Sequence, residues 1–67
     1  MEILELSRYA ETVLTAVNTV KPVTVNSIET KTKLEYWNVI SGLLELELLQ
    51  IIKQLPGKQF IRIEGAV

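Results

Sequence analysis

Residues 43–63 read LLELELLQIIKQLPGKQFIRI, and this stretch decides the fold. Its first six residues, LLELEL, are predicted to be the last part of an apolar helix. Residues 51–55 and 59–63 are rich in β-branched and aromatic side chains, which is typical of strands. Between them, Pro56-Gly57 suits the two central positions of a type II turn, because proline fixes φ and glycine tolerates φ > 0. The stretch therefore predicts a helix followed by a β-hairpin.

The helix that leads into this hairpin is predicted over residues 35–49, with Glu35 at the positive end of its dipole. At about 100° per residue, Val39, Leu43 and Leu46 fall on one side and Tyr36 flanks them. This side is the predicted core face.

A second apolar stripe lies on the opposite side of the same helix and contains Trp37, Ser41, Leu44 and Leu48. A helix that is apolar on two sides is either buried on both or has a partner. An exposed Trp37 could anchor a protein contact or stack on single-stranded bases, whereas the alternative is ordinary packing against neighbouring residues. The two leucines favour protein, so these four residues are the candidate protein interface.

The first helix is predicted over residues 8–19, after Ser7 as its N-cap. Leu6 could act as a hydrophobic staple against the first turn. Pro22 pushes the preceding residue out of helical geometry, so the helix must end before it.

A short β-prone segment, residues 23–25, precedes a second predicted helix over residues 27–32. Asn26 followed three positions later by Glu29 is a capping-box variant. Lys33 stands where a helix-turn-helix commonly has glycine, and Leu34 is the predicted buried residue of the turn.

This order of helices and strands predicts an α+β fold, a winged helix-turn-helix of three helices and a small antiparallel β-wing. We expect it to fill residues 1–67 as a single domain. With 67 residues, 48% of them hydrophobic and 22% charged, the chain should fold as one unit. It has no apolar run near the roughly 20 residues that span a bilayer, and its first residues are acidic, so we expect no membrane partner and a cytoplasmic protein.

The residue inventory also limits the chemistry, because the chain contains neither cysteine nor histidine. Disulfides, zinc sites, thiol nucleophiles and the usual general base are thereby removed. Glu45 and Glu47 point about 200° apart on a helix and cannot form a catalytic pair, so we expect solvated or locally paired carboxylates. We expect no enzymatic activity, catalytic residue, metal or cofactor.

Nucleic-acid binding draws most of its affinity from Lys and Arg, and this chain has seven of them against eight acids. The third helix, which reads the major groove in helix-turn-helix proteins, contains no basic residue over positions 35–50. The candidate phosphate contacts lie before that helix and on the hairpin: Lys31, Lys33, Lys53, Lys58 and Arg62. Scattered solubilising charges are the alternative interpretation.

The order LLELEL, strand, LPGK and aromatic strand closely resembles the C-terminal winged-helix module of the DNA-processing protein A family (DprA, also called Smf). The resemblance covers roughly residues 7–63. It departs at Gln50 and near Lys33, where the family often has glycine. It implies an accessory domain that follows a Rossmann-like domain, which binds single-stranded DNA and hands it to RecA during natural transformation. The chain would then be the C-terminal fragment of a longer protein, and no site residue carries over.

We therefore expect a non-enzymatic accessory domain of a DprA-like DNA-processing protein, with a role in DNA uptake and recombination. Its partner would be another protein or the remainder of the parent protein, with weak nucleic-acid contact at most and with homodimerisation as one outcome. One alternative is a small winged-helix transcriptional regulator that binds duplex DNA as a dimer. Another is a winged helix used only for oligomerisation or docking.

Overall fold

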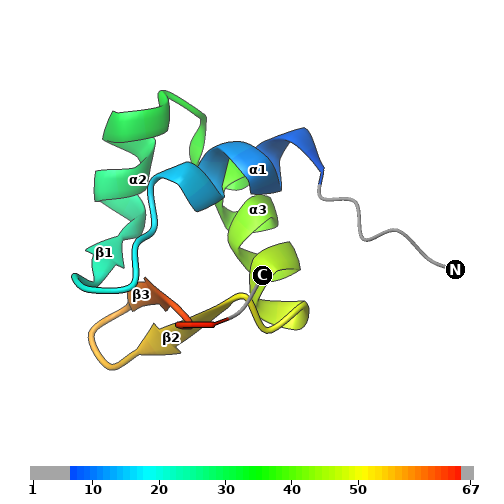
Figure 1. Ribbon diagram of the computed structural model, residues 1–67. Helices are drawn as coiled ribbons and strands as arrows, with labels where there is room; N and C mark the ends of the chain where they lie inside the picture. Colours follow the sequence, from blue (N-terminus) through cyan, green and yellow to red (C-terminus); the bar gives the residue numbers. More distant parts are fainter. Residues whose placement is uncertain (1–6, 66–67) are drawn as a thin grey trace, which may run out of the picture.

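The computed structural model describes residues 7–65. The predicted staple at Leu6 lies outside this range. In chain order the elements are α1 (Arg8–Thr15), β1 (Val23–Thr24), α2 (Val25–Thr32), α3 (Tyr36–Leu48), β2 (Ile52–Leu55) and β3 (Gln59–Arg62) (Figure 1).

These elements form an α+β fold in which the three helices lie on one side of a small sheet (Figure 1). The sheet is antiparallel with strand order β1-β3-β2, so β3 lies in the middle. Phe60 of β3 pairs with Val23 on one side and with Gln54 on the other. This arrangement is compatible with the predicted winged helix-turn-helix.

The core lies between the helices and the inner face of the sheet. The predicted core face of α3 is confirmed, because Val39, Leu43 and Leu46 are buried. Tyr36, which flanks that face, is half exposed. The other buried hydrophobic residues within positions 7–65 are Ala10, Val13, Ala16, Val17, Ile28, Ile51, Ile52 and Phe60.

Gly42 lets α1 and α3 pack closely against each other. A Cβ at this position would lie 2.9 Å from Val13 Cγ2 and 3.0 Å from the carbonyl oxygen of Tyr9. The second neighbour is backbone and cannot rotate away. The absence of a side chain at Gly42 therefore fixes the approach of α1 and, with it, which side of α3 faces inward.

The first helix is shorter than the sequence predicted, because α1 ends at Thr15 and not at residue 19. Its end is set by a turn around Asn18, well before Pro22. The side-chain oxygen of Asn18 accepts hydrogen bonds from the backbone N–H groups of Val20 and Lys21 at 2.8 and 2.6 Å. The backbone carbonyl of Asn18 accepts one from the backbone N–H of Arg62 at 2.9 Å. An asparagine side chain that bonds to nearby backbone donors competes with helix continuation.

The second helix begins earlier than predicted, at Val25, so the predicted strand loses its last residue. The N-cap is Thr24, whose hydroxyl accepts the N–H of Ser27 at 3.2 Å, and the capping role predicted for Asn26 is wrong. Pairing with β3 holds Thr24 in an extended conformation (φ −101°, ψ 165°), which is the backbone geometry that an N-cap needs.

Lys33 and Gln50 stand where the DprA family, which this sequence resembles, often has glycine. Both residues adopt left-handed backbone conformations, with φ of 61° at Lys33 and 62° at Gln50. Lys33 ends α2, and Gln50 lies between α3 and β2. In the hairpin turn, Gly57 has φ of 87°, as the predicted type II turn requires. Lys58 follows with φ of 58°, so the turn contains a second left-handed residue that the sequence did not predict.

Candidate interaction surface

The apolar stripe predicted on the far side of α3 is exposed. Trp37 and Leu48 each retain 75% of their accessible surface and Leu44 retains 57%. Ser41, which lies between them, is also exposed. Neither α1 nor the hairpin covers these side chains. We call Trp37, Ser41, Leu44 and Leu48 the outward face.

Tyr36 extends this surface at the start of α3. Its ring lies against that of Trp37 in an edge-to-face arrangement, with 5.1 Å between centroids and 78° between planes. Apart from this contact the tryptophan is largely solvated. Such edge-to-face pairs contribute about 0.5–1.5 kcal/mol when packed. The two rings present a large apolar area at one end of the outward face.

A groove of about 300 Å³ adjoins the outward face, between α3 and the β2–β3 hairpin. Its apolar lining includes Tyr36, Ile40 and Leu44 from α3, and Glu47 and Lys58 bring opposite charges to it. The sequence did not predict this groove. Tyr36, Ile40 and Leu44 follow one another at intervals of four, so the helical row was readable, but its position beside the hairpin required the structure.

The two carboxylates of α3 have different environments. Glu45 is half-buried, and its carboxylate accepts the backbone N–H of Ser7 at 2.8 Å. It therefore ties the start of α1 to α3, which is a structural role that the sequence did not reveal. Glu47 is exposed beside the groove.

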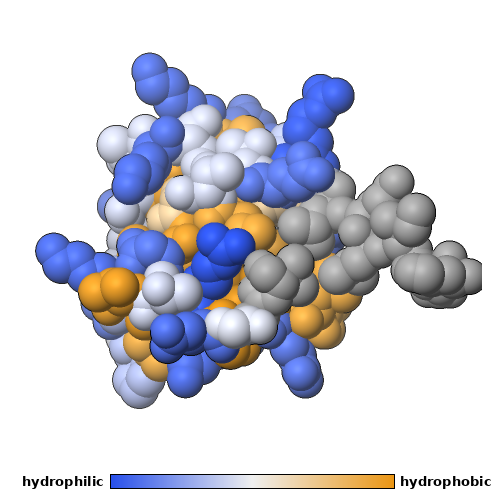
Figure 2. Space-filling model, in the orientation of Figure 1, coloured by the Kyte–Doolittle hydropathy of each residue, from blue (hydrophilic) through white to orange (hydrophobic). Residues whose placement is uncertain are grey.

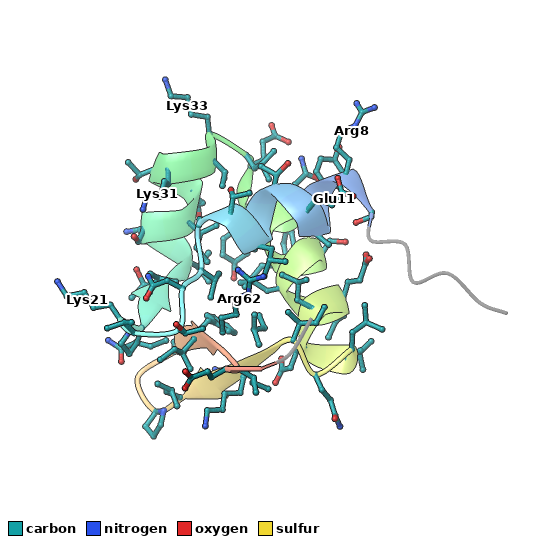
Figure 3. The ribbon with its side chains drawn as sticks, in the orientation of Figure 1. Arg8, Glu11, Lys21, Lys31, Lys33 and Arg62 are labelled. Atoms are coloured by element: carbon teal, nitrogen blue, oxygen red, sulfur yellow. The ribbon has the colours of Figure 1, made fainter. Side chains whose placement is uncertain are left out.

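The five candidate phosphate contacts do not form one strip in the structure. Lys31 and Lys33 lie near the end of α2, whereas Arg62 extends from β3 toward α1 (Figure 3). Arg62 pairs with the buried Ile52 and so belongs to the inner face of the sheet, while the neighbouring Lys53 belongs to its outer face. Lys58 stands apart at the hairpin turn.

The hydropathy of the surface agrees with this dispersed arrangement. On the face seen in Figure 2, hydrophilic side chains project from the periphery and hydrophobic surface lies between α1 and the sheet. Arg62 lies over that central region (Figure 3). A phosphate-binding face would instead gather Lys and Arg side chains on one continuous surface.

Within residues 7–65, no group of three or more His, Cys, Asp or Glu side chains could hold a metal ion. None of the helices in that part of the chain is long and apolar enough to cross a bilayer. No protein-family model, curated protein or solved structure matches this chain. Membership of the DprA family therefore stays a prediction.

Proposed function

We propose that this chain is a non-enzymatic protein-interaction domain of the winged helix-turn-helix type, and that it binds its partner through the outward face of α3. The observation that carries the proposal is the exposure of Trp37 and Leu48 at 75% each on the third helix. In winged helix-turn-helix proteins this helix supplies the contacts to the ligand. Large exposed apolar patches on small domains mark interaction sites, and tryptophan is enriched among the residues that dominate binding energy.

The charge distribution argues against duplex DNA as the main ligand. The helix that would enter the major groove carries Glu45 and Glu47 and no Lys or Arg. Base reading in that groove relies on side chains that donate or accept hydrogen bonds, whereas the outward face offers two such groups, the Ser41 hydroxyl and the Trp37 indole N–H, beside the apolar side chains. The chain has a net charge of −1, so a general attraction to phosphates is also weak.

The resemblance to the C-terminal module of DprA supports a more specific setting for this domain. In that setting it is the accessory domain of a cytoplasmic DNA-processing protein that acts in natural transformation. Its partner is then either the remainder of the parent protein or a further protein of the recombination machinery. Any contact with nucleic acid is weak and secondary to the protein contact.

Selection of helical peptides from a random library on the immobilised domain tests the proposal. We expect the selected peptides to be amphipathic and to lose binding to Trp37→Ala and Leu48→Lys. Val20→Lys is the matched control, because Val20 is 82% exposed but lies outside α3. Peptides that bind the wild type and both α3 variants equally would contradict the proposal.

Titration of a labelled random duplex tests the competing function. We expect affinity no tighter than about 10⁻⁴–10⁻⁶ M at physiological salt, the range of nonspecific binding. Nanomolar, sequence-selective binding that Trp37→Ala abolishes would assign the outward face to DNA and would overturn the proposal.

A further inference from the structure

The spacing of the outward face identifies the kind of surface it fits. Trp37, Ser41, Leu44 and Leu48 follow one another at intervals of 4, 3 and 4 residues. This is the spacing of the inward positions of a coiled coil, in which one helix packs its side chains between those of a facing helix. α3 thus carries one helix seam toward the core and a second toward solvent.

The same spacing is symmetric about the midpoint of the stripe. If a second α3 lies antiparallel across the first, Trp37 faces Leu48 of the other copy and Ser41 faces Leu44. Each end of the interface then combines a ring with a leucine, and the centre combines a small residue with a leucine, which lets the helices approach closely. Twofold symmetry requires such a self-complementary patch.

Charge favours the antiparallel direction over the parallel one. In a parallel pair, Glu45 and Glu47 of both copies would lie at the same level, and α3 contains no Lys or Arg to compensate them. In an antiparallel pair, the two copies of Glu47 are separated by nine residues along the axis, about 13 Å, and the two copies of Glu45 by five residues, about 7.5 Å. Each Glu47 then lies near the positive end of the other helix.

We propose that a second copy of this chain occupies the outward face, with the two α3 helices packed antiparallel about a twofold axis. The inference rests on the proposed function, because it names the partner of the same surface. The exposed side chains of the stripe offer roughly a few hundred Å² per copy, below the about 800 Å² that each partner of a stable interface buries. The dimer is therefore weak and forms at high protein concentration.

Sedimentation equilibrium across a range of protein concentrations tests the association. We expect a reversible monomer-dimer equilibrium for the wild type and for Val20→Lys. Leu44→Lys should weaken association at least tenfold, since it places two ammonium groups near the twofold axis. Its circular dichroism should match that of the wild type, because Leu44 is 57% exposed in the monomer.

An isotope-filtered NOE experiment on a mixture of labelled and unlabelled protein tests the direction of packing. Trp37 and Leu48 are eleven residues apart on one helix, about 16 Å, so a contact between them must be intermolecular. We expect contacts from the Trp37 indole to the Leu48 methyl groups. Contacts between the Trp37 rings of two copies would show parallel packing and overturn the proposal.

The remaining outcomes separate this inference from the proposed function. A wild type that stays monomeric at millimolar concentration, while α3-dependent peptides bind it, would overturn the second copy and retain the protein-interaction domain. A dimer that Leu44→Lys does not weaken would place self-association elsewhere and would also overturn the inference. Absence of both self-association and α3-dependent peptide binding would overturn both.

Discussion

The two faces of α3 have similar hydrophobicity but opposite environments. Leu43 is 2% exposed and its neighbour Leu44 is 57% exposed. Both are leucines on the same turn, so composition does not separate them. Their angular position does, because α1 packs against one side of the helix at Gly42 and nothing in the described chain covers the other side. An apolar helix in a small domain can therefore serve the core and an interface at the same time.

The largest expected effect distinguishes these two neighbouring leucines. Leu43→Ala should destabilise the fold by about 2–5 kcal/mol, because it removes buried methyl groups and leaves a cavity. That is comparable with the whole stability expected at this size. Leu44→Ala should change stability by about 0.5 kcal/mol or less, as is usual for surface positions. Thermal unfolding followed by circular dichroism measures both, and equal losses would mean that Leu44 is part of the core.

Gly42 and Ser41 provide the next test of the same contrast. Gly42→Ala should destabilise the domain by about 1–3 kcal/mol, because the added methyl group would overlap Val13 and the backbone of Tyr9. The better helix propensity of alanine offsets at most about 1 kcal/mol of this. Ser41→Ala, on the outward face, gains propensity without any clash and should be neutral or slightly stabilising. Chemical denaturation gives the two free energies, and a stabilised Gly42→Ala variant would contradict the close approach of α1.

The two glutamates of α3 should differ more modestly. Glu45→Ala removes the acceptor of the Ser7 N–H and should cost about 0.5–1.5 kcal/mol. Glu47→Ala removes an exposed carboxylate and should be close to neutral. Hydrogen exchange at the amide of Ser7 provides a second readout. We expect it to accelerate in the Glu45 variant alone, and equal rates in the two variants would show that Glu45 does not hold the start of α1.

The smallest effects are expected at the two left-handed residues that bracket α3. Lys33→Gly and Gln50→Gly should each stabilise the fold by less than about 1 kcal/mol, because glycine adopts φ > 0 without strain but gains entropy in the unfolded chain. Lys31→Gly is the control. It lies in the last turn of α2, where glycine should cost up to about 1 kcal/mol. Losses at all three positions would mean that Lys33 and Gln50 are not strained.

Features that depend on residues close in sequence could be predicted from the sequence, whereas features that depend on tertiary contacts could not. The bounds of α3, predicted as 35–49 and observed as Tyr36–Leu48, follow from a long apolar period and a nearby turn. The predicted end of α1 and the predicted start of α2 were wrong, because both depend on tertiary contacts. Arg62 bonds to the carbonyl of Asn18, and β3 holds Thr24 extended beside it.

The candidate interaction surface was likewise predictable from the sequence only where it depends on a single helix. Periodicity alone located the outward face, since the phase of a helix relative to its core is a local property. The groove was missed because Lys58, ten residues after the end of α3, comes back to the helix only when the hairpin folds. The tie between Glu45 and Ser7 was missed for the same reason, as it joins residues 38 positions apart.

The fluorescence of Trp37 is the most direct measurement of whether α3 presents an apolar docking surface. Trp37 is the one tryptophan in the chain, so its emission reports on this face alone. In dilute solution we predict red-shifted emission that acrylamide quenches efficiently. Emission should shift to the blue and quenching should fall as protein concentration rises or a selected peptide binds, while random duplex leaves both unchanged. A blue-shifted, quencher-resistant tryptophan in the dilute monomer, or one that only duplex DNA protects, would contradict the account.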